Sequence, residues 1–265
     1  MSGTPLYLGV GRLAGRLEGA DEPMIPLFDR AGKRRRWPVI VVLLALINIA
    51  VFAYEVSLPA TALGCLIHDY SAIPRYVMQL AAQPPDPACP VYTTPKPVLL
   101  PMVTSLFLHA GWLHIAGNML FLLVFGDNVE DRLGHMGFAL FYLACGLAGI
   151  VTQTLVDPHA TVPMIGASGA IAGVLAAYLV FSPGARVRTL LLVILVDIPA
   201  WLLIGLWIIF QALSGMAVFG AAADTTGSVA YFAHLGGFAT GFIIALLYRW
   251  FAPALPERKA PSASL

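Results

Sequence analysis

A serine, three histidines and an asparagine with the chemistry of acyl transfer lie inside stretches that are otherwise apolar. They are Ser168, His234, His109, His114 and Asn118. A serine hydroxyl is a poor nucleophile at its ordinary pKa, and an imidazole can act as the base that activates it. Side-chain N–H groups can stabilise the oxyanion that forms when a hydroxyl attacks a carbonyl. The residue types therefore allow a serine nucleophile, a histidine base and an oxyanion site.

Composition indicates that these residues lie in a membrane. The chain has 265 residues, of which 59% are hydrophobic and only 11% are charged, whereas a soluble domain has about 25% charged residues. Several apolar runs approach the 20 residues that cross a bilayer as a helix. We expect an all-α membrane protein, a bundle of six transmembrane helices at about 37–54, 99–125, 137–156, 164–182, 194–213 and 229–251.

The fifth span has two interpretations. The apolar run from Thr189 to Gln211 contains Asp197, and a span over this run would place that carboxylate near the bilayer centre, which would indicate function. A span that starts near Ile194 is also long enough to cross. It leaves Asp197 at the cytoplasmic interface and 185–193 as an interfacial segment. We favour the later start.

Polar segments flank and connect these spans. Residues 1–36 are expected to form a cytoplasmic tail that ends in a basic run at 30–36, and 252–265 a second tail. Such a basic run usually sets topology or meets anionic lipid, so we expect no nucleic-acid partner. A long external connection at about 55–98 contains a possible surface helix at 73–82.

Two further features concern the connections between spans. Cys65 and Cys89 lie in the external connection and would pair if it faces an oxidising compartment, but two free thiols are equally compatible with the sequence. Asp127 and Glu130 lie in a polar stretch at 126–134 that we interpret as a turn. Their spacing fits a capping box for the helix that follows, so we expect a structural role for both acids.

The charge distribution predicts the topology. Of the 15 lysines and arginines, only Arg75 and Lys96 lie in connections on the side of the membrane opposite to the termini. Because cytoplasmic segments carry the excess of positive charge, both termini should be cytoplasmic. The second, fourth and sixth spans then enter from outside, and Ser168 should lie one turn into its helix, at nearly the depth of His234.

Glycine pairs predict that the fourth and sixth spans meet. Gly169 with Gly173, and Gly237 with Gly241, each form a GxxxG pattern. Such faces let two helices approach backbone to backbone. The hydroxyl and the imidazole would then come within hydrogen-bonding reach.

Each polar residue also has a simpler explanation. A serine in an apolar helix often hydrogen-bonds to its own backbone, and an intramembrane histidine is often a packing residue. Two histidines such as His109 and His114 can ligate a metal, but i,i+5 spacing does not place both on one helix face, and no carboxylate or thiolate lies at their depth. His114 and Asn118 do share a face. We expect no metal or other cofactor.

Three motifs together resemble the rhomboid intramembrane serine proteases: GASG at 166–169, HxxxxHxxxN at 109–118 and AHxGG at 233–237. The resemblance covers about 37–251. It implies a dyad of Ser168 with His234 and no third acidic member. It also implies an oxyanion site formed by His114, Asn118 and the Ser168 amide, with supporting roles for His109, Gly166, Gly169 and Gly237.

The resemblance implies an intramembrane serine endopeptidase, which cleaves transmembrane helices near their outer end. Its partners would be single-span membrane proteins and the lipid bilayer; no oligomeric state is indicated. The composition is compatible with a bacterial inner membrane, with the site facing the non-cytoplasmic side. The polar turn at 130–134 looks like a structural family feature.

The sequence departs from the family in two places, and two rival functions remain. Some members have an aromatic residue one turn after the serine, which stacks on the histidine, but this chain has Ala172 there. Some also have a Trp-Arg pair in the first external connection, which we do not find here. The first rival is a catalytically inactive relative that binds client helices. The second, a small-solute transporter, would need inverted repeats or broken helices, and the sequence shows neither.

Overall fold

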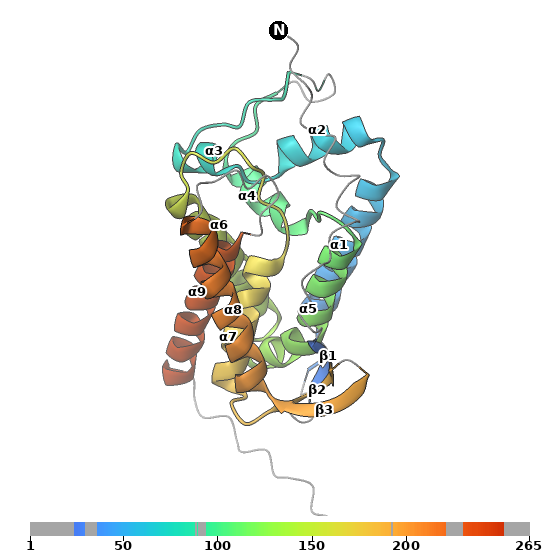
Figure 1. Cartoon of the computed structure of the whole chain (residues 1–265), viewed down its shortest axis with the longest axis vertical. Coiled ribbons are helices and arrows are strands. Elements are labelled where there is room, and N and C mark those ends of the chain that lie inside the picture. Colours follow the sequence, from blue (N-terminus) through green and yellow to red (C-terminus); the bar gives the residue numbers. More distant parts are fainter. Residues whose placement is uncertain are drawn as a thin grey trace, which may run out of the picture.

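The protein is a helical bundle with a small sheet at one end and a cover of short helices and loops at the other (Figure 1). The computed structural model describes residues 24–29, 36–87, 89, 94–191, 193–220 and 230–251. Most of the basic run at 30–36 and the tail at 252–265 lie outside the described residues, so the two tails expected from the sequence stay largely predictions.

Within the described residues, five helices are long and apolar enough to cross a membrane. They are α1 (Val39–Ser57), α5 (Trp112–Leu133), α6 (His135–Val156), α8 (Ala200–Gly220) and α9 (Tyr231–Phe251). The predicted fourth span corresponds to α7 (Ser168–Phe181), an apolar helix of only 14 residues. At 1.5 Å per residue it is about 21 Å long, shorter than the hydrocarbon core of a bilayer. The count of six spans and their orientation remain predictions.

The short helix α7 is the centre of the bundle. All but three of its residues are buried, and it packs mainly against α9, α6 and α5. A helix that is apolar all round belongs in such a core. Because its neighbours surround it, its first residue can lie inside the protein instead of at the bundle's rim.

The second predicted span is wrong in its bounds. Residues expected to form one helix at 99–125 instead form α4 (Leu99–Thr104) and a 3-10 turn (Ser105–Phe107), and the chain becomes extended at Leu108 before α5 begins. Every element here is apolar, so hydropathy could not reveal the break. At its other end α5 continues to Leu133, through the stretch that was interpreted as a polar turn.

The acids near the end of α5 do not form the capping box predicted for the next helix. That helix, α6, follows Gly134 (φ 74°) and has no side-chain cap. Glu130 is fully buried and its carboxylate instead accepts the backbone N–H groups of Ile40 and Val41 at 2.9 and 2.8 Å. These N–H groups belong to the first turn of α1, where helical donors lack partners. The structural role expected for Glu130 is therefore exerted on a different helix, 90 residues away in sequence.

The start of the fifth span is also wrong. Residues 186–199 form a β-hairpin of β2 (Arg186–Leu191) and β3 (Ile194–Pro199), and α8 begins only at Ala200. A strand from the N-terminal segment, β1 (Met24–Asp29), pairs antiparallel with β2, which gives the order β1-β2-β3. Asp197 lies in β3 outside the helix, and its carboxylate pairs with the Arg188 guanidinium. The apolar residues of β3 were interpreted as the start of the span, whereas their β-branched side chains in fact suit a strand.

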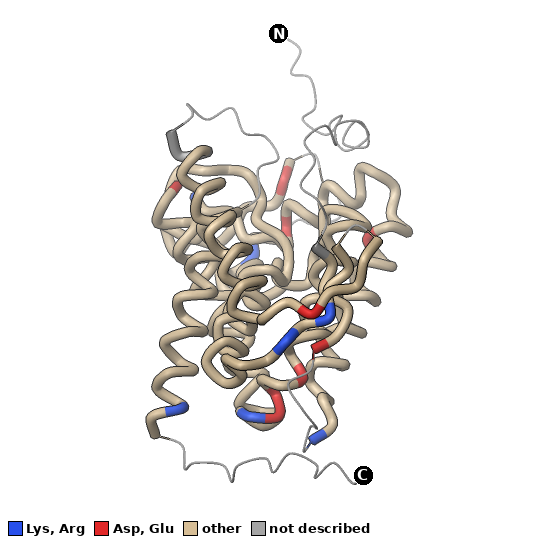
Figure 2. The backbone as a smooth tube through the Cα atoms, turned by 60° about the horizontal axis from the view of Figure 1, so that its bottom comes forward, with Lys and Arg blue, Asp and Glu red and all other residues tan. Residues whose placement is uncertain are grey.

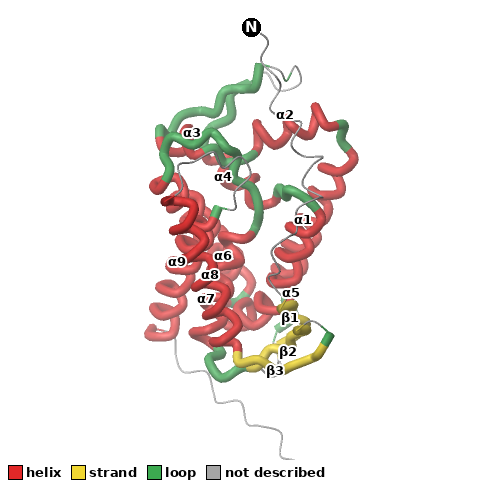
Figure 3. Tube along the Cα trace, viewed as in Figure 1, coloured by secondary structure: helices red, strands yellow, loops and turns green. Residues whose placement is uncertain are grey.

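The opposite end carries α2 (Ala60–Tyr70), α3 (Pro74–Met78) and long loops (Figure 3). Cys65 and Cys89 form a disulfide, which decides between the two alternatives left open by the sequence. The predicted surface helix at 73–82 is present only as the five residues of α3.

Basic residues of the described part gather toward the sheet end (Figure 2). Arg186 and Arg188 lie in β2, and the Arg249 guanidinium binds the carbonyl of Val180 near the end of α7. Arg75 lies in α3 at the other end. This segregation is consistent with the predicted topology.

Candidate active site

The structure brings Ser168 and His234 into direct contact. The serine Oγ lies 2.6 Å from Nε2 of the histidine. Ser168 is the first residue of α7, not one turn inside it as the sequence suggested, and His234 lies in the first turn of α9. The serine is partly exposed, whereas the histidine is buried. The pair therefore has an accessible hydroxyl and an enclosed imidazole.

Backbone contact between α7 and α9 holds this pair together. A Cβ added at Gly237 would overlap the carbonyl oxygen of Gly169, and one added at Gly241 would overlap the backbone of Gly173. The two GxxxG patterns thus face each other, as the sequence predicted. Since no side chain separates the helices, the backbone itself sets the distance between the hydroxyl and the imidazole.

His114 and Asn118 face the backbone just before the serine. Gly166 has φ 120°, and a Cβ there would lie 2.7 Å from Nε2 of His114 and 3.7 Å from Nδ2 of Asn118. Its own N–H donates to the carbonyl of Ser105 at 2.9 Å. Gly166 therefore has both a conformational and a steric reason to be glycine.

The side chains of His114 and Asn118 each have an N–H group that is available to donate a hydrogen bond to a ligand. The N–H of Ala110 donates to Nδ1 of His114 at 3.3 Å, so the neutral ring carries its proton on Nε2, the atom that faces Gly166. Nδ2 of Asn118 is buried and has no hydrogen-bond partner within the described residues. Buried donors without a partner are rare and often mark a functional site. Two N–H groups on one side of the serine can stabilise an oxyanion.

His109 supports this arrangement from outside it. Its Nδ1–H donates to the carbonyl of Phe107 at 3.2 Å, and its backbone N–H donates to the buried carboxylate of Glu55. Its ring lies edge-on against the ring of His114, with centroids 5.2 Å apart. Sequence reasoning missed Glu55, although an acid at the end of an apolar helix was a signal that could have found it.

Sequence reasoning also missed two residues of α8 that contact the histidine. Oε1 of Gln211 lies 2.6 Å from Nδ1 of His234. The ring of Trp207 lies 5.7 Å from the imidazole, tilted by 37°. The aromatic support that Ala172 cannot give is therefore supplied by another helix. The signal was a glutamine within an apolar run, four residues after a tryptophan.

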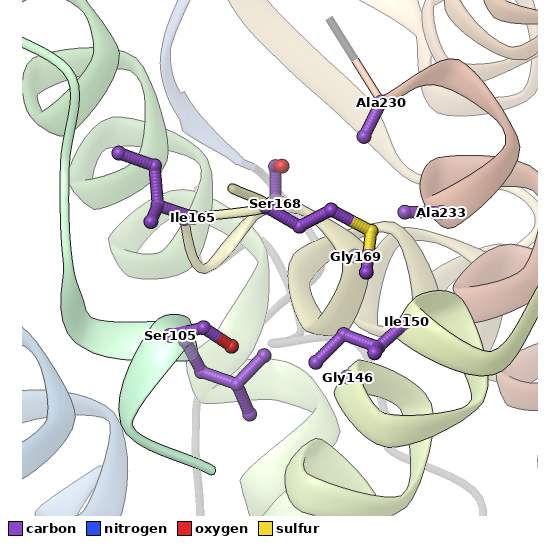
Figure 4. Close-up of a pocket in the computed structure, with 11 residues that line it drawn as sticks. Ser105, Gly146, Ile150, Ile165, Ser168, Gly169, Ala230 and Ala233 are labelled. Carbon is purple, nitrogen blue, oxygen red and sulfur yellow. The ribbon is translucent and has the colours of Figure 1, made fainter. Parts of the chain in front are cut away.

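A small cavity of about 30 Å³ opens beside Ser168 (Figure 4). Its walls come from the 3-10 turn, from α6, from the loop before α7 and from the beginnings of α7 and α9. The lining residues include Ser105, Ile150, Met164, Gly166, Ser168 and Ala233. A cavity of this size has room for at least one water molecule.

The chain matches the model of the Rhomboid domain over residues 97–251. A bundle of apolar helices around a serine and a histidine agrees with that match, and the chain belongs to the rhomboid family of integral membrane proteins. It is 30% identical to the mitochondrial Rhomboid protein 1 of Saccharomyces cerevisiae over 172 residues, which are 63% of this chain and 45% of the yeast protein.

Two shorter matches differ in what their names say of activity. The chain is 41% identical to the Rhomboid protease GluP of Bacillus subtilis over 78 residues, which are 29% of this chain and 15% of GluP. It is 36% identical to Inactive rhomboid protein 1 of Drosophila melanogaster over 75 residues, which are 28% of this chain and 5% of that protein. The chain spans less than half the length of these relatives. Family membership alone therefore does not decide between protease and inactive protein.

Proposed function

We propose that this protein is an intramembrane serine endopeptidase in which Ser168 is the nucleophile and His234 the base. The observation that supports this most is the 2.6 Å contact between the serine Oγ and the histidine Nε2. This distance is within the range for proton transfer between a nucleophile and its base. An inactive relative has no need to keep both groups in this geometry.

The reaction divides into two acyl transfers. Ser168 Oγ attacks the scissile carbonyl while His234 Nε2 takes the hydroxyl proton, and the carbonyl oxygen becomes an oxyanion that accepts hydrogen bonds from His114 Nε2–H and Asn118 Nδ2–H. The imidazolium then gives its proton to the leaving amine as the C–N bond breaks. Water, deprotonated by His234, then attacks the acyl carbon, and the imidazolium returns the proton to Ser168 Oγ as the acid product leaves. General acid–base help contributes about 10²–10⁴ to the rate and one oxyanion donor about 10²–10³.

The cavity beside the serine favours a small side chain next to the scissile bond. Its volume of about 30 Å³ fits a methyl or hydroxymethyl group better than a branched or aromatic one. A peptide bond within a helix is shielded by its neighbouring turns, so the substrate must also unwind locally. We therefore propose single-span membrane proteins with small, weakly helical residues near the end of the span as substrates.

The charge distribution supports a site that faces the non-cytoplasmic side. The loop that leads to Ser168 pairs with the segment before α3, through Met164 and Ala72, at the end of the bundle that carries α2, α3 and the disulfide, whereas most described basic residues lie at the sheet end. With positive charge inside, both termini are cytoplasmic and the cleaved bonds lie near the outer surface. The inner membrane of a bacterium fits this orientation.

The test is cleavage of a panel of single-span proteins by the purified protein in lipid, with the cut sites mapped by mass spectrometry. Ser168→Ala should abolish cleavage and keep the wild-type helical content, because the change removes only the hydroxyl. Ser182→Ala, at the other end of the same helix, should cleave normally. Undiminished cleavage by Ser168→Ala would refute the dyad.

The inactive alternative makes the opposite prediction for a chemical probe. A fluorophosphonate reacts with an activated serine, so the wild type should be labelled at Ser168 and Ser168→Ala should not. A wild-type protein that binds client helices but is neither labelled nor cleaves any of them would be an inactive binder.

A further inference from the structure

The imidazole of His234 has a second hydrogen-bonded neighbour that the serine–histidine pair does not account for. We infer that Gln211 is a positioning residue, which holds His234 in the one neutral tautomer that can accept the serine proton. The inference rests on the proposed function and adds a third member to the pair, on a helix that carries neither of the other two.

The hydrogen-bonding capacity of an amide oxygen determines this tautomer. Oε1 of Gln211 lies 2.6 Å from Nδ1 of His234, and both side chains are buried. An amide oxygen only accepts, so Nδ1 must carry the hydrogen. A neutral imidazole then has its lone pair on Nε2, which is the atom 2.6 Å from Ser168 Oγ.

The opposite tautomer would block the reaction. With the hydrogen on Nε2, the ring could only donate to the serine and could not take its proton. Free imidazole populates both forms, so an amide that presents its oxygen and not its NH₂ group to Nδ1, as Gln211 does, raises the fraction of competent enzyme. After proton transfer, the same oxygen accepts from the Nδ1–H of the imidazolium.

Trp207 restricts the motion of the imidazole ring by packing on its face, while Gln211 restricts it through a hydrogen bond at its edge. The two residues are four apart on α8 and therefore share one side of that helix. The indole lies 5.7 Å from the imidazole, so the imidazole could rotate only if the indole moved. Together they restrict both the tautomer and the plane of the base.

A structural explanation also exists, because a buried glutamine in an apolar helix gains stability from any partner. The two explanations differ in what they predict for turnover. A merely structural bond would change stability without changing the tautomer or kcat of the folded protein, whereas a positioning bond would change both.

Two substitutions at this site separate the explanations. Gln211→Met keeps the length of the side chain and removes the acceptor, whereas Gln211→Glu keeps an acceptor at the same reach. We expect Gln211→Met to lower kcat and the rate of fluorophosphonate labelling about 10- to 100-fold, less than the full contribution of acid–base catalysis because His234 itself remains, with KM little changed. Gln211→Glu should stay within about tenfold of the wild type on the same scale.

Gln153→Met is the matched control. Oε1 of Gln153 also accepts a hydrogen bond from α9, but from the backbone N–H of Phe232 at 3.1 Å and not from the imidazole. Its loss should lower the melting temperature slightly and leave kcat within about twofold.

A spectroscopic measurement tests the tautomer without any substrate. In protein labelled with ¹⁵N-histidine, His234→Ala identifies the His234 signals, and their shifts report which nitrogen carries the hydrogen. The wild type should have it on Nδ1, and Gln211→Met should show a mixture of forms. Wild-type kcat in Gln211→Met, a loss in Gln211→Glu as large as in Gln211→Met, or a wild-type hydrogen on Nε2 would each overturn the inference. A wild type that neither cleaves nor is labelled would instead refute the proposed function, and the spectrum would still decide the role of Gln211.

Discussion

The helix α9 meets its two neighbours in opposite ways. Against α7 it packs backbone to backbone, with Gly237 and Gly241 against the carbonyls of the facing helix. Against α8 it packs through side chains, of which Trp207 and Gln211 reach the imidazole. The first contact sets the distance between the Ser168 hydroxyl and the His234 imidazole, and the second sets how that imidazole is oriented.

The α7–α9 and α8–α9 contacts also differ in how well they should tolerate substitutions. Nearly every residue of α7 is buried, so a shift there must displace the whole core. Large apolar side chains of α8, among them Leu206, Ile209 and Phe210, point away from the protein, where lipid would cover them. Substitutions at the first contact should therefore damage both fold and activity, and substitutions at the second should reduce activity alone.

The largest effect is expected from a methyl group between α7 and α9. In Gly237→Ala the new Cβ would overlap the carbonyl oxygen of Gly169, and separating the helices moves Ser168 away from His234. We expect a loss of about 1–3 kcal/mol in stability and at least a ~100-fold loss of cleavage, since a misplacement of 1 Å can cost that much. Thermal unfolding in detergent and fluorophosphonate labelling measure the two effects.

Gly205→Ala on α8 is the control for this change. A Cβ there would have no neighbour within 4 Å, so the variant should keep its activity and gain up to about 1 kcal/mol in helix stability. Wild-type activity in Gly237→Ala would show that the backbone contact does not set the catalytic distance.

A similar loss of activity with a smaller effect on the fold is expected on the other side of the serine. Gly166→Ala would strain a residue with φ 120° and push its Cβ against the ring of His114, while both contacts of α9 remain. We expect kcat to fall about 10²–10³-fold, as for loss of an oxyanion donor, and stability to change by no more than about 2 kcal/mol. Equal kcat in variant and wild type would remove His114 from the proposed oxyanion site.

The smallest effect is expected at the face of the imidazole. Trp207→Ala removes the indole that packs on His234, an interaction of about 0.5–1.5 kcal/mol. We expect kcat to fall about 2- to 10-fold, while the melting temperature of the protein stays unchanged. Trp207→Phe, which keeps an aromatic face, should recover most of the loss, and a Phe variant as poor as the Ala variant would argue against ring packing.

Sequence reasoning worked where one local pattern carries the information. Small residues four apart, as in Gly169 with Gly173, have meaning in any apolar helix, so the contact between α7 and α9 could be predicted. The sequence also singled out Ser168 and His234, because polar groups in apolar runs are few. Their catalytic roles stay proposals.

Sequence reasoning failed where the outcome depends on a distant partner. Glu130 seemed to belong to a polar turn, but it is buried because α1 presents N–H groups to it. The second strand of the hairpin before α8 was interpreted as the start of a helix, since it is mostly apolar and the pairing of the hairpin with the N-terminal strand is not visible locally. Gln211 was visible as a polar residue in an apolar run, but its partner His234 is 23 residues away and cannot be recognised from the local sequence.

The disulfide between Cys65 and Cys89 has a consequence for biogenesis. It ties α2 to the loop that precedes α4, on the end of the bundle toward which Ser168 lies. Cystines of this kind mature where thiols are oxidised. Synthesis in a reducing host would therefore yield two free sulfhydryls and a less constrained connection between α2 and that loop, and a recombinant preparation should be checked for its redox state before its activity is measured.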